Sequence, residues 1–166
     1  AVYTATLNPT EATLEWASAA EGVTESGLQM GGIVFVGGNN YATANGYWIQ
    51  YRIPSSGSGN WFRVWVLQNG SFVSGSNVDS PTFTQSLSPG STMRVVFNKA
   101  TYAFQCFIGG TAVATVTPTN KSVDVTTKYA GVMLRGQQAN DVEVFSVSTT
   151  TDNTAHSDIT TDSKST

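Results

Sequence analysis

The sequence predicts an all-β domain, built as a two-sheet antiparallel β-sandwich. Short apolar runs recur along the chain between turn residues such as Gly, Pro, Asn and Ser, and no long stretch has the period of a helix. The length of 166 residues fits one domain with a real core. About a dozen strands are too many for one open sheet of this size, so we expect two packed sheets.

Each expected strand is an apolar or alternating run bounded by turn residues. The stretch of residues 10–21 could instead hold a helical turn. In chain order, the strands are expected over residues 2–7, 12–17, 27–36, 46–53, 61–68, 71–74, 82–87, 92–98, 101–108, 111–117, 129–135 and 142–149.

A hairpin formed by residues 46–53 and 61–68 carries three of the four tryptophans of the chain. The connecting residues 54–60 read Pro-Ser-Ser-Gly-Ser-Gly-Asn, which favours a turn. Alternation gives each arm two faces. The better core face consists of Tyr47, Ile49, Tyr51, Ile53, Phe62, Val64 and Val66.

Two registers of this hairpin bring the core residues to one face. One register sets Arg52 directly across from Arg63, and like charges opposite each other cost stability. The other gives an aromatic pair, a hydrogen-bonding pair and a cation–π pair. We therefore predict the second register, which pairs Trp48 with Trp65, Gln50 with Arg63 and Arg52 with Trp61.

The opposite side of the hairpin is the candidate site for a ligand or a partner. Aromatic residues and Arg are enriched where proteins bind, and planar rings beside fixed donors also suit sugars. Three interpretations stay open: loops or another strand layer cover the tryptophans as a second core, a neighbouring subunit docks here, or a sugar binds here. We call this surface the outer hairpin face, defined by Trp48, Gln50, Arg52, Trp61, Arg63 and Trp65.

Composition excludes several classes of partner. The net charge is −3 and no Lys/Arg-rich run occurs, which argues against nucleic acid. The apolar runs are too short for membrane insertion. Only 11% of residues are charged, and this Gly-, Ser-, Thr- and Asn-rich balance is typical of extracellular and virion β-proteins. The chain begins at Ala1 without a signal-like segment, so we expect a processed product or a segment of something longer.

The chain has few residues suited to nucleophilic or metal chemistry. Cys106 is the only cysteine and alternates with apolar neighbours, which predicts a buried structural thiol. His156 is the only histidine and lies near the C-terminus, which excludes a Ser-His-Asp triad or a His/Cys metal site inside the fold. We expect no cofactor. Calcium stays open because it takes oxygen ligands. The available ligands, whose spacing forms no calcium loop, are Asn39, Asn40, Asp79 and Asp124.

After Thr149 the sequence becomes polar, and Ile159 is its only sizeable apolar residue. Such a segment cannot bury enough surface to fold by itself. We predict a sandwich domain over residues 1–148 and a C-terminal tail over residues 149–166, acting as a linker, a disordered end or an arm that orders against a neighbour.

Residues 93–117, 129–135 and 141–147, with the aromatic run 46–52 upstream, resemble the concanavalin A-like jelly rolls. This superfamily includes legume lectins, laminin G-like modules and many glucanase domains. Gly109-Gly110 suits a two-residue hairpin with positive φ. The residues expected to supply the inter-sheet core are Phe104, Phe107, Val113, Val116, Val132, Leu134, Phe145 and Val147.

The resemblance also implies a setting. Domains that are Ser/Thr/Gly-rich, low in charge and free of disulfides are similar to those appended to bacteriophage tail and head-surface proteins, where they decorate the particle or touch host glycans.

The glucanases of the superfamily carry Glu-x-Asp-x-x-Glu on one strand, and this chain has no such motif. Its closely spaced acids are expected to be solvated, because the first two pairs lie on no convincing aromatic strand and the third has no second catalytic element beside it. They are Glu11 with Glu15, Glu21 with Glu25, and Asp141 with Glu143.

The sequence therefore favours a non-enzymatic binding or structural module of a larger assembly. The assembly is expected to be a phage virion or tail, where the module contacts other subunits or a host glycan. The alternatives are a secreted carbohydrate-binding lectin-like protein and a glycan hydrolase whose carboxylates converge only in the fold.

Overall fold

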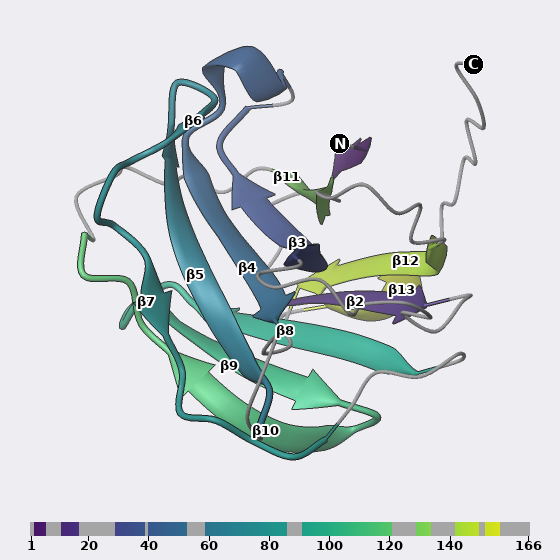
Figure 1. Cartoon of the computed structure of the whole chain (residues 1–166). Helices are drawn as coiled ribbons and strands as arrows, with labels where there is room; N and C mark the ends of the chain where they lie inside the picture. Colours follow the sequence, from purple (N-terminus) through teal and green to yellow (C-terminus); the bar gives the residue numbers. More distant parts are fainter. Residues whose placement is uncertain are drawn as a thin grey trace, which may run out of the picture.

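The structure is a computed structural model. It describes the backbone of residues 2–5, 11–16, 29–38, 40–52, 59–85, 91–120, 129–133, 142–149 and 152–156. Within these ranges the strands form two antiparallel sheets that pack face to face (Figure 1). The predicted two-sheet sandwich is therefore confirmed.

The first sheet, sheet A, holds the hairpin of interest. Its strand order is β1-β11-β3-β4-β5-β6, and β7 pairs with β5 beside β6. The strands of sheet A are β1 (Val2–Ala5), β3 (Gln29–Val36), β4 (Gly46–Arg52), β5 (Trp61–Gln68), β6 (Ser71–Phe72), β7 (Val78–Asp79) and β11 (Tyr129–Met133).

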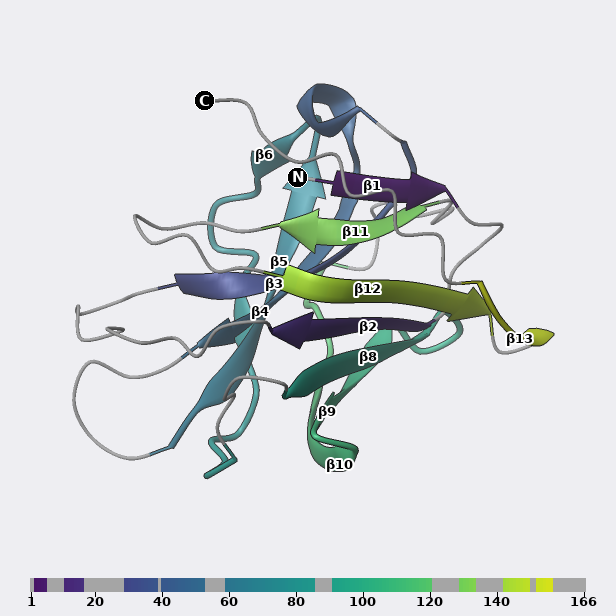
Figure 2. The same ribbon diagram turned by 90° about the vertical axis from the view of Figure 1, so that its right-hand side faces the viewer.

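The second sheet, sheet B, has the order β10-β9-β8-β2-β12-β13. The chain passes repeatedly between the two sheets, as a jelly roll does: β2 and β12 belong to sheet B, whereas β1, β3 and β11 belong to sheet A (Figure 2). The strands of sheet B are β2 (Glu11–Trp16), β8 (Thr92–Asn98), β9 (Ala103–Ile108), β10 (Thr111–Val116), β12 (Val142–Thr149) and β13 (Asp152–His156). A short 3-10 helix, Tyr41–Thr43, precedes β4.

Most predicted strands are present with small differences at their ends. The helical turn considered for residues 10–21 is wrong for residues 11–16, which form β2. The strand expected over residues 82–87 is wrong for residues 82–85. Phe83 forms only an isolated bridge with Asn60, because Pro81 has no N–H with which to continue the pairing that β7 begins. Neither β7 nor β13 was predicted.

Strand β13 lies within the segment that the sequence assigned to the C-terminal tail. It pairs with β12 at the edge of sheet B, and backbone pairing of this kind needs no apolar side chain. The division into residues 1–148 and 149–166 stays a prediction.

The core between the sheets is rich in aromatic rings. Phe97 and Phe104 are stacked, with ring centroids 4.4 Å apart and planes at 8°. The predicted core residues Tyr47, Ile49, Tyr51, Phe62, Val64 and Val66 are all fully buried there, and Phe104, Val116 and Val132 are buried beside them.

Phe107 was predicted in this core, and that prediction is wrong. Phe104 and Phe107 have opposite parity on β9, so the two side chains leave opposite faces of the strand. Phe107 is half-buried and lies under the guanidinium of Arg94, with Cζ 3.8 Å from the ring centroid. Val113 packs against the core from a half-buried position. Leu134, Phe145 and Val147 lie outside the described side chains.

Two further local predictions are confirmed. Gly109 and Gly110 form the two-residue turn between β9 and β10, with φ of 54° and 82°. Cys106 is fully buried in the core, and burial raises the pKa of its thiol. The buried thiol is therefore poorly suited to act as a nucleophile.

Candidate binding site on the outer hairpin face

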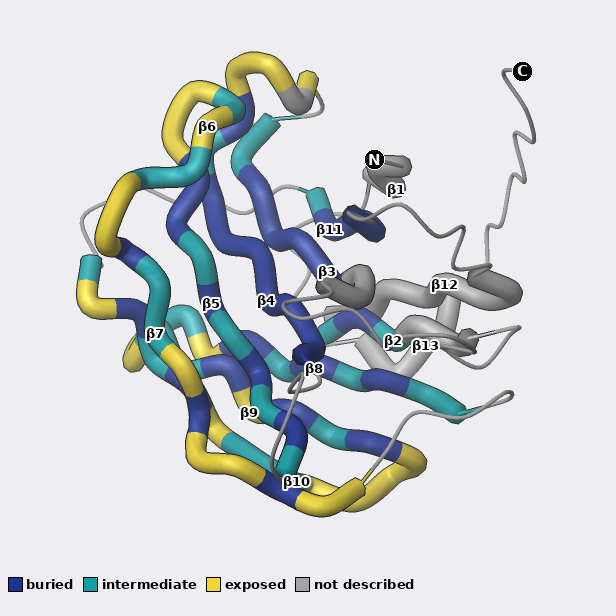
Figure 3. Tube along the Cα trace, in the orientation of Figure 1, coloured by how far each residue is buried: buried dark blue, intermediate teal, exposed yellow. Residues whose placement is uncertain are grey.

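The β4–β5 register places the six residues of the outer hairpin face as predicted. Trp48 pairs with Trp65, Gln50 with Arg63 and Arg52 with Trp61. The core residues of both strands face sheet B, so the six lie on the other side of sheet A. Their burial differs between the strands: β4 is buried at every position, whereas β5 alternates between buried and half-buried up to Val66 (Figure 3).

Trp48 belongs to a second hydrophobic core. Its ring is fully buried and stacks on Phe72 of β6, with centroids 5.4 Å apart. Phe72 also contacts Trp65, at 5.2 Å between centroids. The interpretation that the tryptophans form a second core therefore holds for Trp48. The buried members of this core are Val34, Val36, Ala44, Trp48, Leu67 and Met133, with Trp65, Phe72 and Tyr129 partly buried beside them.

Gln50 fixes the orientation of Trp65. The indole Nε1–H of Trp65 donates to Gln50 Oε1 at 3.0 Å. Gln50 is fully buried, and in the described part of the chain its own Nε2 donor has no hydrogen-bond partner. The side-chain amide of Gln50 therefore accepts the hydrogen bond of the Trp65 indole, while its own Nε2–H groups have no acceptor among the described residues.

Arg63 is held by an acid on the neighbouring strand. Asp79 of β7 lies directly across from it, and the guanidinium donates to both carboxylate oxygens, with Nη2 2.6 Å from Oδ2. This hydrogen bond raises the pKa of Arg63 above the ordinary value of Arg. Its Cζ also lies 5.6 Å from the centroid of Trp65. Arg63 is thus compensated in charge and partly exposed.

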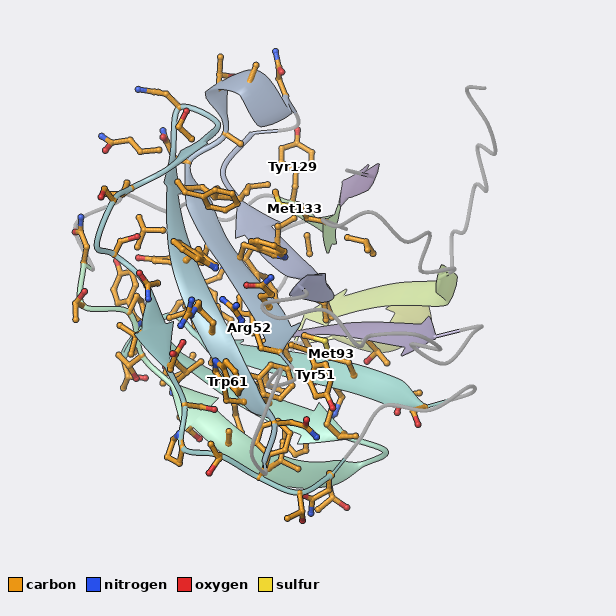
Figure 4. All side chains as sticks on the ribbon, viewed as in Figure 1. Tyr51, Arg52, Trp61, Met93, Tyr129 and Met133 are labelled. Carbon is orange, nitrogen blue, oxygen red and sulfur yellow. The ribbon has the colours of Figure 1, made fainter. Side chains whose placement is uncertain are left out.

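Arg52 has no such acid. Its side chain is buried, with 9% of the residue exposed, and its Cζ lies 5.5 Å from the centroid of Trp61 (Figure 4). Among the described residues, no carboxylate pairs with it and its Nε has no hydrogen-bond partner. Burial, followed by repulsion from Arg63, lowers the pKa of Arg52, while Asp79 acts in the opposite direction.

Four buried N–H donors of the outer hairpin face have no hydrogen-bond partner among the residues that the structure describes. Buried donors are nearly always paired, and leaving one unpaired costs about 1–3 kcal/mol. A surface that concentrates unpaired donors is complementary to a group rich in acceptors. The four atoms are Trp48 Nε1, Gln50 Nε2, Arg52 Nε and Trp61 Nε1.

Sequence reasoning missed two residues of this surface. Asp79 was considered only as a calcium ligand, and its role as the partner of Arg63 depends on β7, which was not predicted. Phe72 ends the two-residue strand β6, and nothing in the sequence indicated that its apolar side chain covers Trp48. Alternation along β4 and β5 could find the face, but the packing of β6 on it depends on the third dimension.

The other candidate chemistries find limited support in the described residues. No group of three His, Cys, Asp or Glu side chains that could hold a metal occurs among them. Asn40 uses its side-chain oxygen to accept from the N–H of Ala42, and Glu11 pairs with Arg94 on sheet B. The remaining calcium and acid candidates lie outside the described side chains, namely Asn39, Asp124, Glu15, Glu21, Glu25, Asp141 and Glu143.

In the part of the chain that the structure describes, no helix is long and apolar enough to cross a membrane.

Comparisons with known proteins add little to this geometry. No protein-family model and no curated protein matches the chain. Among solved structures, the chain is similar to the β-porphyranase BpGH16B from the human gut bacterium Bacteroides plebeius, with a TM-score of 0.41 and 8% sequence identity. The match covers 81% of this chain and 55% of the porphyranase, so this chain spans about half of that protein.

Proposed function

We propose that the protein is a non-enzymatic binding module of a larger extracellular assembly, such as a virion, and that it holds a glycan at the outer hairpin face. The single observation that carries this proposal is that Arg52 and Trp61 hold N–H donors without a partner among the described residues, beside the aromatic rings on one side of β4 and β5. Sugars present hydroxyl acceptors for such donors and apolar ring faces for aromatic side chains.

The part of the face that a ligand can reach lies on β5. Trp61, Arg63 and Trp65 are half-buried, whereas Trp48 and Gln50 are fully buried. Trp48 is therefore unsuited to a binding test, because Trp48→Ala would empty the second core and lower stability by about 3–5 kcal/mol.

Binding is best tested with Trp61→Ala and Trp65→Phe. The labelled protein is screened on a glycan array, and the dissociation constant of a retained glycan is measured by isothermal titration. We expect Trp61→Ala to bind at least about tenfold more weakly, because it loses a ring and an N–H donor. Trp65→Phe should bind several-fold more weakly, because its smaller ring loses the hydrogen bond to Gln50 that orients it. The matched control is Phe107→Ala, which removes a half-buried ring from sheet B and should leave binding unchanged.

Two results would overturn the proposal. Equal binding by wild type, Trp61→Ala and Trp65→Phe would show that the glycan does not bind at this face. Release of reducing ends from the bound glycan would show that the module is an enzyme.

A neighbouring subunit is the second candidate for the same face. The observation that favours it is the apolar second core, in which Trp65, Phe72 and Tyr129 are only partly buried. A stable protein interface buries upwards of about 1,000 Å². Cross-linking within the assembled particle would test this candidate, because a subunit contact should place Phe72 and Tyr129 within reach of the neighbour.

A further inference from the structure

We infer that the glycan bound at the outer hairpin face is acidic, and that Arg52 with the N–H group of Trp61 receives its carboxylate or sulfate group. This inference rests on the proposed function and names the chemical class of its ligand. It starts from the different surroundings of the two arginines of the face.

Arg63 and Arg52 differ in whether a neighbouring carboxylate balances their positive charge. Arg63 donates to both oxygens of Asp79 and keeps 20% of its side chain exposed. Arg52 is more deeply buried, repelled by Arg63, and paired with no carboxylate of the described residues. A buried charge without an opposite charge is costly, and an anion that binds beside it recovers that cost.

The donors around Arg52 match an anion with several oxygens. Trp61 lies directly across from Arg52. The indole Nε1–H of Trp61 and the Nε–H of Arg52 are buried and have no hydrogen-bond partner among the described residues. A carboxylate or sulfate has several lone pairs and no donor of its own, so one such group can accept from more than one of these N–H groups.

The size of the accessible surface favours a sugar over an acidic protein segment. Of the six residues, only Trp61, Arg63 and Trp65 on one strand are half-buried, and Arg52 keeps 9% of its surface exposed. A protein interface needs about 20–30 residues on each side. One or two sugar rings that carry a charged group fit the smaller surface.

The test uses matched pairs of glycans that differ only in charge. The carboxylate pair is a hyaluronan oligosaccharide and its carboxyl-reduced form. The sulfate pair is a keratan sulfate oligosaccharide and its desulfated form. Isothermal titration of the whole chain should show that at least one acidic form binds about tenfold or more tightly than its uncharged counterpart, since hydrogen bonds to charged groups are worth about 1.5–3 kcal/mol.

The variant Arg52→Gln should lose this preference and bind the two members of a pair alike. The matched control is Arg94→Gln, which makes the same change of charge on the outer face of sheet B and should keep the preference. Trp61→Phe keeps a ring but removes one donor, and should reduce the preference several-fold.

The unliganded protein gives a second readout. Arg52→Gln removes a buried guanidinium that has no carboxylate partner among the described residues, so its thermal unfolding midpoint should equal or exceed that of the wild type. A lower midpoint would show that Arg52 has a structural role and would overturn the inference.

The outcomes separate the two proposals. If glycans bind the face but no acidic form is preferred, or if Arg52→Gln keeps the preference, the inference fails and the proposed function stands. If no glycan binds, charged or neutral, both fail.

Discussion

Trp65 donates its indole N–H to the side-chain oxygen of Gln50 across the β4–β5 hairpin, at 3.0 Å. Gln50 is fully buried, whereas Trp65 is half-buried. The bond therefore anchors an accessible ring to the interior and fixes the surface that the proposed ligand would meet.

We expect this hydrogen bond to contribute measurably to stability. Trp65→Phe should lower the free energy of unfolding by about 1–2 kcal/mol, because it leaves the buried oxygen of Gln50 without a donor. Gln50→Leu should have a similar cost, since it leaves the Trp65 N–H without its acceptor. Urea denaturation of both variants measures these costs.

The double variant is the control for this prediction. The two costs should not add, and the coupling energy should be about 1 kcal/mol. Additive costs would mean that the bond does not form in solution.

Opposite exposure of two phenylalanines on β9 gives a second prediction. Phe104 stacks on Phe97 in the core, so Phe104→Ala should cost about 3–5 kcal/mol. Phe107 is half-buried under Arg94, and Phe107→Ala should cost about 1 kcal/mol through the lost cation–π contact. Denaturant unfolding measures the loss of stability in both variants, and each variant is the matched control for the other. Similar losses would contradict the assignment of Phe104 and Phe107 to opposite faces of β9.

Alternation and charge were sufficient to predict the register of the hairpin. Only one register separates Arg52 from Arg63, and the structure adopts it. The same reasoning could not reveal that Trp48 is covered, because the ring that stacks on it belongs to Phe72 of a two-residue strand. Nor could it pair Arg63 with Asp79, since that contact requires β7 to lie beside β5. Periodicity identifies the faces of a strand, whereas the cover of a face comes from elements distant in sequence.

The turn between β9 and β10 gives a third prediction. Gly110 has φ of 82°, which an L-residue with a Cβ adopts at a cost. Gly110→Ala should lower the free energy of unfolding by about 1 kcal/mol, while Gly109→Asn should be nearly neutral, because Asn-Gly suits a two-residue turn. The control is Gly38→Ala: Gly38 has no positive φ and a Cβ there would meet open space. Equal costs at Gly38 and Gly110 in urea denaturation would refute the turn assignment.

Two buried ionisable groups of the core, a cysteine thiol and a tyrosine hydroxyl, should make the protein less stable at alkaline pH. Burial raises the pKa of the Cys106 thiol and of the Tyr47 hydroxyl, and Tyr102 adds to the effect at Tyr47. In the unfolded chain the two groups lose their protons near their ordinary values of 9.0 and 10.0, whereas in the folded protein they keep them. The unfolded state then binds fewer protons, so stability is complete below about pH 9 and falls as the pH rises.

Each group should contribute about 1.4 kcal/mol of lost stability per pH unit above its unfolded pKa. Urea denaturation between about pH 9 and about pH 10 should therefore show a clear decline for the wild type. Cys106→Ala removes the first of the two groups, and its decline over the same range should be shallower, although a cavity lowers its stability at every pH. The comparison depends on slopes, so the cavity cancels. Parallel slopes in wild type and variant would show that the thiol ionises as readily in the folded protein as in the unfolded chain, contrary to its burial in the core.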